Sequence, residues 1–473
     1  MACLLSIAPV HSQNAAAAKY RQVNDSMVAC FNRNDFKGIY RLGNDFFKAN
    51  QSEDDCVHDF SSEKKNTGDI TTTELSADLG GVQYFTWYGK NANARLELRV
   101  EDGMMKQYRF GGFVLQPGTP PAPILTNNPL KTHLDSVVHQ YAVIYMAAPS
   151  AVSLSIGVYR NGEKHIYNYG EVKKGSGVVP NSNTIYQVGS IAKTFIGILL
   201  GRAVADKKMQ LGDDVRKYLP GSYPNLSYKG QPITLQDLAN HTGGFRQFNF
   251  ITYPPGIDSM PWNDFMHYLY AYPKESVIND LHRLKVDTLP GVERNYSVGG
   301  FIILGMALES VYHQPLNTIF NDYYGKTLHM GNTWLNAPES DSANFAIPYD
   351  EKGHAELPML RSTPGLFTVK STVADMLKYV EANVKENDLG ILLSHKPGWG
   401  DPTNFAVGLG WQVFDTWEWG LKINHSGHDA GYNALCTAYP NEGLGFVLLQ
   451  NENGRQGTLY ILERSLFQSL QRK

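Results

Sequence analysis

Residues 184–201 read Thr184-Ile-Tyr-Gln-Val-Gly-Ser-Ile-Ala-Lys-Thr-Phe-Ile-Gly-Ile-Leu-Leu-Gly201. This pattern predicts a short extended run over 184–188, a break at Gly189 and a helix that begins at Ser190. Apolar residues cover every face of that helix, which is typical of a helix buried in a domain core. Lys193 lies in its first turn, and a lysine is almost never buried without a partner or a chemical role.

Ser190 and Lys193 are three residues apart, so they lie on the same face of the predicted helix. The lysine amine can therefore reach the serine hydroxyl. The helix N-terminus adds a positive field at the place where an oxyanion would form. Together these features predict an activated serine nucleophile.

The same spacing also occurs where no apolar helix is expected. Ser61 with Lys64 and Ser62 with Lys65 lie in the polar run Ser-Ser-Glu-Lys-Lys-Asn. The alternative interpretation of Ser190 is an ordinary helix N-cap whose neighbouring lysine extends to the surface. The spacing alone does not decide between the two, so the rest of the chain has to be considered.

The bulk composition is that of a large globular protein with two or three domains. The 473 residues are 42% hydrophobic and 12% aromatic, which is enough apolar material for a large core. A formal net charge of −3 gives no electrostatic case for binding nucleic acid or an anionic membrane. No apolar run approaches the length of a transmembrane helix.

We expect residues 1–18 to be the remnant of an export signal, because residues 2–10 are mostly apolar although a basic leading segment is missing. The protein would then be periplasmic or extracellular; a disordered terminus is the alternative. Cys30 and Cys56 could form a disulfide bond in an exported protein, and two unpaired buried thiols are the other reading.

Residues 19–115 are predicted to form a small α+β domain. Apolar residues recur at helical spacing over 19–50, and the period changes to two after residue 68. Three runs read as strands, namely 83–88, 94–100 and 104–110. Two helices followed by an antiparallel meander resemble the cone-shaped fold of the nuclear transport factor family. Because no catalytic set stands out here, we expect an accessory or dimerising module.

A proline-rich linker is predicted over 116–130, and a second α+β domain over 131–473. Its first elements would be a helix over 134–145 and a hairpin that turns at Asn161-Gly162. Three strands, 421–425, 434–439 and 446–450, and a helix over 457–471 would close the chain. Strands at both ends of the domain, with helices between them, predict an antiparallel sheet covered by helices.

Six segments of this second domain match, in order, the motifs of serine β-lactamases and penicillin-binding proteins. They are Gln187–Thr194, Leu238–Gly244, Leu289–Gly291 with Asn295–Val298, Thr363–Val369, Gly408–Trp411 and His425–His428. The domain therefore resembles this family, and most closely the branch of class C β-lactamases, D-alanyl-D-alanine carboxypeptidases and related esterases. The resemblance implies a β-lactamase/transpeptidase-like fold, with a sheet flanked by helices and a helical subdomain.

The resemblance also implies the catalytic roles. Ser190 would attack an acyl carbon, and Lys193 would take the hydroxyl proton. Tyr296 would lie opposite, share that proton and deliver it to the leaving group. The alternative for Tyr296 is a half-buried core tyrosine.

The last motif would supply the substrate-binding strand. His425 and Gly427 would line the cleft, and the backbone N–H groups of Ser190 and His428 would form the oxyanion hole. His241 is expected to hold its own loop. Three tryptophans could wall the cleft or belong to the core, namely Trp411, Trp417 and Trp419.

Two positions depart from the family pattern. Val298 replaces an asparagine that in relatives hydrogen-bonds the amide side chain of the substrate, which favours an esterase or peptidase over an efficient β-lactamase. His425 replaces a lysine and removes a permanent charge that would bind a substrate carboxylate, although a protonated histidine could still do so.

We therefore predict a serine acyl hydrolase of D-alanyl carboxypeptidase or esterase type, acting on a small-molecule or peptide substrate. One alternative is a β-lactamase, and another is a non-catalytic penicillin-binding-like receptor or scaffold. A third reading places a nucleophile elbow of the α/β-hydrolase type at Asn295–Gly299, but no apolar β-branched strand precedes it. No metal or organic cofactor is implied.

Overall fold

The computed structural model describes residues 10–78, 83–90, 93–111, 124–148, 150–245, 260, 262–350, 352–361, 368–416, 420–453 and 456–471. The chain forms two compact units, Met1–Thr119 and Pro120–Lys473. The predicted linker over 116–130 falls mostly outside the described residues, and the predicted domain limits stay predictions. No helix among the described residues is long and apolar enough to cross a membrane.

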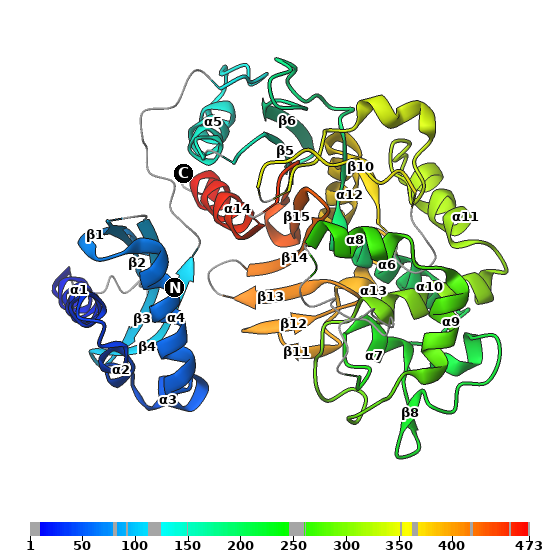
Figure 1. The fold of residues 1–473 in the computed structure, drawn as a ribbon, viewed down its shortest axis with the longest axis horizontal. Helices are drawn as coiled ribbons and strands as arrows, with labels where there is room; N and C mark the ends of the chain where they lie inside the picture. The colour runs from blue at the N-terminus through cyan, green and yellow to red at the C-terminus, as the bar shows by residue number, and fades with distance from the viewer. Residues whose placement is uncertain are drawn as a thin grey trace, which may run out of the picture. The chain divides into compact units, whose positions relative to one another are not determined.

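The first unit has four helices followed by a four-stranded antiparallel sheet (Figure 1). The elements are α1 (Val10–Asn32), α2 (Phe36–Arg41), α3 (Asp45–Asn50), α4 (Glu53–Thr67), β1 (Ile70–Asp78), β2 (Gln83–Gly89), β3 (Asn93–Glu101) and β4 (Met104–Gly111). The helix α4 was not predicted. An aromatic core joins helices to sheet, with the Phe31 and Trp87 ring centroids 5.2 Å apart.

Cys30 and Cys56 are free thiols, so the disulfide reading is wrong.

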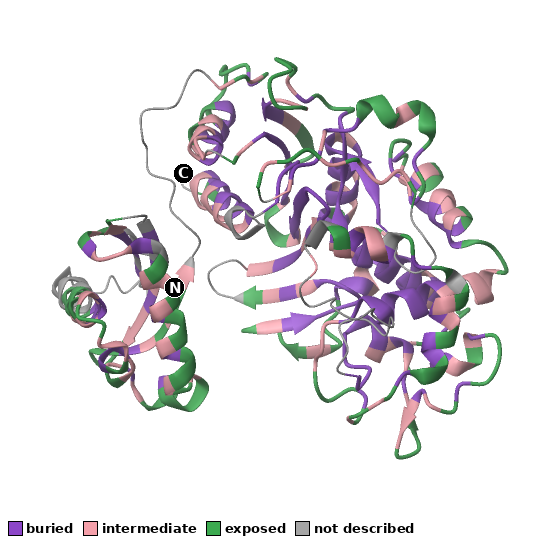
Figure 2. Cartoon of the chain, in the orientation of Figure 1, coloured by how far each residue is buried: buried purple, intermediate pink, exposed green. Residues whose placement is uncertain are grey.

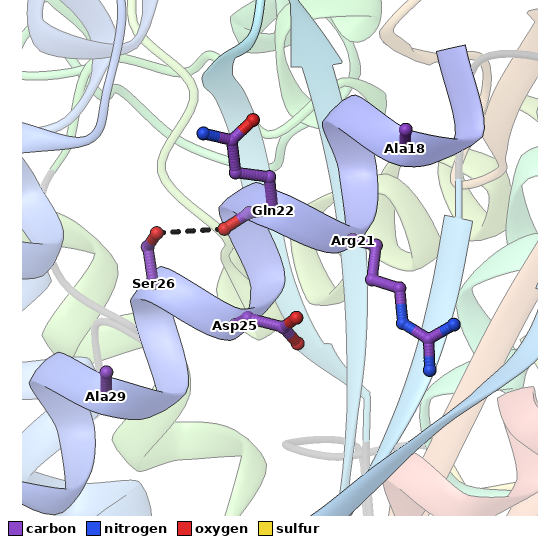
Figure 3. Close-up of a pocket in the computed structure, with 6 residues that line it drawn as sticks. All are labelled: Ala18, Arg21, Gln22, Asp25, Ser26 and Ala29. Atoms are coloured by element: carbon purple, nitrogen blue, oxygen red, sulfur yellow. Dashed lines mark hydrogen bonds between the residues drawn. The ribbon is translucent and has the colours of Figure 1, made fainter. Parts of the chain in front are cut away.

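A hollow lies along one face of α1 (Figure 3). Its lining residues are Ala18, Arg21, Gln22, Asp25, Ser26 and Ala29. The Ser26 hydroxyl donates to the carbonyl oxygen of Gln22 at 2.8 Å. That bond is local to the helix, and Arg21, the basic residue of this lining, stays protonated and cannot take a proton from the serine, so this hollow is not a candidate catalytic centre.

The second unit is built on an eight-stranded antiparallel sheet with the strand order β11-β12-β13-β14-β15-β16-β5-β6 (Figure 1). Its strands are β5 (Ser153–Arg160), β6 (Glu163–Gly170), β11 (Trp399–Asp401), β12 (Phe405–Val407), β13 (Gln412–Thr416), β14 (Gly420–Asp429), β15 (Tyr432–Tyr439) and β16 (Leu444–Gln450). The predicted turn between β5 and β6 is present, with positive φ angles at Asn161 and Gly162. The predicted α+β class and antiparallel sheet flanked by helices are confirmed.

Helices cover both faces of this sheet. The helices α5 (His133–Met146) and α14 (Gln456–Gln471) lie side by side, whereas α12 (Val373–Lys385) packs against β5, β15 and β16. The remaining helices are α6 (Ala192–Ala205), α7 (Leu235–Ala239), α8 (Trp262–Tyr270), α9 (Lys274–Arg283), α10 (Val298–Tyr312), α11 (Leu316–Phe320) and α13 (Leu389–His395). Short strand pairs join β7 (Ile185–Gln187) to β10 (Lys370–Thr372) and β8 (Ser227–Tyr228) to β9 (Gln231–Pro232).

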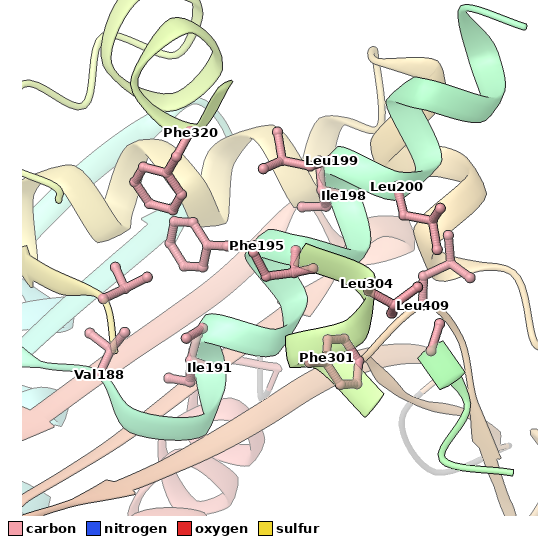
Figure 4. Close-up of a cluster of buried hydrophobic side chains, with 14 of the residues drawn as sticks. Val188, Ile191, Phe195, Ile198, Leu199, Leu200, Phe301, Leu304, Phe320 and Leu409 are labelled. Atoms are coloured by element: carbon pink, nitrogen blue, oxygen red, sulfur yellow. The ribbon is translucent and has the colours of Figure 1, made fainter. Parts of the chain in front are cut away.

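The helix α6 runs through the centre of the second unit. Its buried residues are Ala192–Gly201 together with Ala203, and buried positions dominate the surrounding interior in Figure 2. Figure 4 shows Phe195 against Phe320 on one side of α6. Leu304 of α10 and Leu409 belong to the same cluster. The all-round apolar sequence of this segment is therefore explained by burial on every side.

Candidate active site

The serine of the first motif lies in a tight turn that leads into α6. A single 3₁₀ turn, Gly189–Ile191, precedes α6, and no side chain caps either helix start by a hydrogen bond. Ser190 is therefore not an N-cap. Its hydroxyl oxygen instead accepts a hydrogen bond from Lys193 Nζ at 3.0 Å. Lys193 is only 6% exposed, so the pair lies at the boundary between core and solvent.

Aromatic side chains fix the position of α6. The Thr194 and Tyr379 hydroxyl oxygens are 2.7 Å apart, and the Phe195 ring stacks on Tyr379 with centroids 4.2 Å apart. The Tyr324 hydroxyl donates to the carbonyl oxygen of Phe195 at 2.7 Å. The contacts with Tyr379 and Tyr324 hold the first turn of α6 in place, so Lys193 has little freedom to move away from Ser190.

Tyr296 reaches the pair from the loop before α10. Lys193 Nζ lies 4.9 Å from the centroid of the Tyr296 ring. The ring packs in turn on His241, with centroids 4.5 Å apart. His241 has a positive φ of 63°, and its Nδ1 accepts the backbone N–H of Ser297 at 3.0 Å. His241 thus holds the loop that carries Tyr296, as expected from the sequence.

The strand β14 places the last motif beside the nucleophile turn. A side chain at Gly427 would meet the carbonyl oxygen of Val188 at 1.8 Å, and one at Gly189 would meet the backbone nitrogen of His428 at 2.6 Å. The two backbones therefore touch with no side chain between them. This close approach brings the N–H groups of Ser190 and His428 into the same small region.

The His425 side chain is neutral. Burial, together with the positive charges of Lys193 and Arg294, lowers its pKa to about 3. Its Nδ1 lies 2.6 Å from the carbonyl oxygen of Ser426, which can only accept, so Nδ1 carries the proton. The buried surroundings of His425 therefore disfavour the protonated form that would bind a substrate carboxylate. Burial also holds the pKa of His241 well below its usual range.

Sequence reasoning missed Arg294, which lies near these histidines. Its positive charge lowers the pKa values of both His241 and His425. Its guanidinium carbon lies 5.0 Å from the centroid of the Phe405 ring, and its Nε is buried without a hydrogen-bond partner among the described residues. Its position two residues before Tyr296 was the available signal.

A second missed residue is Tyr460 on α14. Its side chain hydrogen-bonds Ser426, and burial raises its pKa. Because α14 is the last helix of the chain, nothing in its local sequence connects it with the His425–His428 segment. The hydrogen bond between Tyr460 and Ser426 therefore links α14 to β14 beside the His425–His428 segment.

Other residues singled out from the sequence have structural places. Ser297 is 1% exposed and caps α10 through its hydroxyl, which accepts the N–H of Gly300 at 3.1 Å. No strand precedes it in the described segment 262–297, so it is not a nucleophile elbow. Trp411 is fully buried against Tyr379 and belongs to the core. Trp417 and Trp419 lie outside the described residues.

No group of three or more His, Cys, Asp or Glu side chains in the described part is arranged to hold a metal ion.

Comparison with known proteins places this geometry in a family. The Beta-lactamase family model matches residues 138–466. A β-lactamase of Pseudomonas fluorescens is 24% identical over 368 residues, which cover 68% of this chain and 94% of that protein. A β-lactamase of Escherichia coli K12 is 22% identical over 366 residues, covering 68% and 89%.

Solved structures share the fold. A β-lactamase/D-alanine carboxypeptidase from Pseudomonas syringae superposes with a TM-score of 0.61 at 21% identity, covering 71% of this chain and 99% of that one. An octameric penicillin-binding protein homologue from Pyrococcus abyssi gives a TM-score of 0.61 at 20% identity, covering 71% and 77%. Because the family model spans most of the chain, this protein belongs to the serine β-lactamase and penicillin-binding-protein family.

Proposed function

We propose that this protein is a serine hydrolase that passes through an acyl-enzyme intermediate on ester or amide substrates. The observation that carries the proposal is the 3.0 Å hydrogen bond between Lys193 Nζ and Ser190 Oγ, made inside a buried layer and beside the ring of Tyr296. A lysine with no catalytic task would be expected at the surface or in an ion pair.

The proposed reaction has two halves. Lys193 acts in its neutral form: Ser190 Oγ bonds to the acyl carbon while its proton passes to that amine, and the N–H groups of Ser190 and His428 stabilise the carbonyl oxygen as it becomes an anion. Tyr296 relays the proton to the leaving alcohol or amine, and the bond between the acyl carbon and the leaving group breaks. Water then adds to the acyl carbon, and cleavage of the bond to Ser190 Oγ returns the proton to the enzyme.

The decisive experiment is labelling with a fluorophosphonate, followed by mass spectrometry of the modified peptide. We expect one label, on Ser190. Ser190→Ala should lower turnover by ~10³-fold or more, and Lys193→Ala should do nearly the same, because the pair acts as one unit. Ser61→Ala is the matched control, since Ser61 shares the Ser-x-x-Lys spacing, and it should keep full activity. Wild-type rates in Ser190→Ala, or a label on Ser297, would overturn the proposal.

We infer from Val298 that esters are preferred over β-lactams. Val298, the first residue of α10, is 8% exposed and offers no hydrogen bond to a substrate amide. We expect hydrolysis of short-chain p-nitrophenyl esters with little turnover of cephalosporins. The relatives named as β-lactamases make β-lactam hydrolysis the second candidate. Rapid cleavage of nitrocefin by the wild-type protein would favour that candidate.

The charge that binds an anionic substrate would come from Arg294. His425 is neutral, and no ion pair among the described residues includes Arg294. An arginine without a carboxylate partner can bind a substrate carboxylate through two parallel hydrogen bonds. We therefore infer that substrates with a carboxylate near the scissile bond are preferred over neutral ones.

We also propose that the first unit mediates self-association and that the protein is exported. The octameric penicillin-binding protein homologue gives a precedent for assembly in this fold, although it establishes no state for this chain. Light scattering of the full chain and of residues 120–473 would test self-association. Fractionation of expressing cells would test export. Recovery of the protein in the cytoplasmic fraction alone would contradict it.

A further inference from the structure

A buried charged network lies just behind the proposed oxyanion hole. Lys370 and Asp429 are both fully buried, and the carboxylate acts electrostatically on the lysine. Thr368 joins them: its hydroxyl donates to Asp429 Oδ2 at 2.6 Å, and its carbonyl oxygen accepts from Lys370 Nζ at 3.3 Å. Buried opposite charges in one connected network are held in a narrow range of geometries, because any displacement leaves a charge without compensation.

One end of the network is attached to the nucleophile. Lys370 lies on β10 opposite Gln187 of β7, and the N–H of Val188 donates to the carbonyl oxygen of Val369 at 2.9 Å. Lys370 Nζ also donates to the carbonyl oxygen of Leu335 at 2.7 Å, which anchors it to a further segment. The strand that leads directly into Ser190 is therefore bound to the network.

The other end is attached to His428. Asp429 is the last residue of β14 and directly follows His428, and its Oδ1 accepts the N–H of Ala430 at 2.8 Å. The network thus holds the chain on both sides of the seam where Gly189 and Gly427 meet. Since no side chain fits into that seam, its geometry has to be set from outside it.

We propose that Lys370 and Asp429 are positioning residues that align the N–H groups of Ser190 and His428 into one oxyanion hole. The inference rests on the proposed function, because it assigns the pair a task in the same reaction. Both side chains are fully buried, so they would act through the backbone and not by touching the substrate. Burial lowers the pKa of Lys370 to about 7, while Asp429 opposes that shift, which agrees with a pair whose members depend on each other.

The test compares two buried lysine–carboxylate pairs, each of which has one member on β14. Lys422, near the start of β14, bonds Glu463 of α14 at 2.9 Å, and both side chains are largely buried. Asp429→Asn and Lys422→Met should both lower the melting temperature, because each leaves an uncompensated buried charge. Only Asp429→Asn should lower kcat for a p-nitrophenyl ester, by about tenfold to a hundredfold, with KM changed less than about twofold.

The affinity for phenylboronic acid is a measure of the oxyanion hole that does not change when only the stability of the fold changes. Its boron bonds to Ser190 Oγ and becomes a tetrahedral anion whose oxygen occupies the oxyanion hole. Its affinity should fall in parallel with kcat in Asp429→Asn and stay unchanged in Lys422→Met. Equal losses of kcat and of boronate affinity in the two variants would overturn the proposal.

A double variant separates positioning from stability. Lys370→Met with Asp429→Leu removes both charges, and such replacements often restore stability. We expect the melting temperature to recover relative to Asp429→Asn, while kcat and boronate affinity stay low. Recovery of kcat together with the melting temperature would show that the pair does not position the hole.

Hydrogen exchange at the backbone amides tests the pair without any reaction. We expect faster exchange over residues 188–190 and 427–429 in Asp429→Asn, and wild-type exchange there in Lys422→Met. If the wild-type protein neither hydrolyses esters nor binds the boronate, the proposed function fails, and the exchange data still decide whether the pair orders this seam. Unchanged exchange in Asp429→Asn would contradict the positioning role.

Discussion

The backbone N–H of Ser297 donates to Nδ1 of His241 at 3.0 Å. This bond crosses from the turn after α7 to the residue that follows Tyr296. The carbonyl oxygen of His241 accepts the N–H of Asn295 at 2.8 Å, so the histidine is bonded on both sides of the tyrosine. The placement of the proposed proton relay thus depends on a side chain that does not itself react.

Two substitutions of His241 test whether its side chain is needed to hold the loop that carries Tyr296. His241→Ala loses the acceptor for the Ser297 N–H and puts alanine, which tolerates the left-handed region less well than histidine, at a φ of 63°, so we expect kcat to fall by about tenfold or more. His241→Asn keeps a side-chain oxygen acceptor and tolerates the left-handed backbone, so it should retain most of the activity. Steady-state kinetics with an ester substrate would measure both, and equal activity in the two variants would contradict this role.

Gly427→Ala should disable the site. The added methyl group would lie 1.8 Å from the carbonyl oxygen of Val188, so the nucleophile turn and β14 have to separate. We expect the rate to fall by about a hundredfold or more, with a loss of fluorophosphonate labelling. Gly325→Ala is the control, because a side chain there meets no atom within 4 Å. A Gly427→Ala enzyme with normal kinetics would show that the close approach is not needed.

Acid should destabilise the protein partly through His425. Its pKa is near 6.5 in the unfolded chain and about 3 in the folded one, so the unfolded state binds the extra proton as the pH falls below 6.5. As the pH falls from 6.5 to 5, this group therefore lowers the free energy of unfolding by about 2 kcal/mol. His425→Gln should lose less stability than the wild-type protein over that range. Urea unfolding at pH 7 and pH 5 would measure the difference, and identical pH dependence would contradict a neutral His425.

Arg294→Gln should change the preference for acidic substrates more than it changes kcat. For matched esters with and without a carboxylate, we expect KM to rise by about tenfold or more for the acidic ester only, since a buried charge-assisted pair is lost. Arg361→Gln is the control: this exposed arginine pairs with Glu339 and its removal changes net charge equally. A similar rise in KM for both esters in Arg294→Gln would argue against carboxylate binding.

Much of the fold was predictable because local patterns agreed with burial. The segment 192–205 is apolar on all faces and is buried on all faces, and Asn161-Gly162 has the positive φ angles that its hairpin requires. The helix α4 was missed because, among its residues from Glu53 to Lys65, only Cys56 and Phe60 are buried, so its apolar pattern is too sparse to reveal helical spacing. The short strands β11, β12 and β13 were missed because three to five residues cannot display an alternation.

The candidate site was predictable only as far as its motifs extend. Ser190, Lys193 and Tyr296 come together as the resemblance implied, because each lies in its own recognisable segment. Lys370 and Asp429 were not found, since 59 positions separate them along the chain and neither stands in an unusual local sequence. The charge state of His425 also could not be read from the sequence, because it depends on complete burial and on two cations from other segments.

The helix α4 carries the same three-residue spacing between serine and lysine as the reactive segment, but with the opposite outcome. There the Ser61 hydroxyl donates to the carbonyl oxygen of His58 at 3.0 Å, and Lys64 Nζ pairs with Asp69 at 2.7 Å. Spacing is the same in both helices, and only the surroundings differ. Transfer of this serine and lysine into another scaffold should therefore include the apolar residues that surround α6. In a solvent-exposed helix the two side chains bind other partners, as Ser61 and Lys64 do.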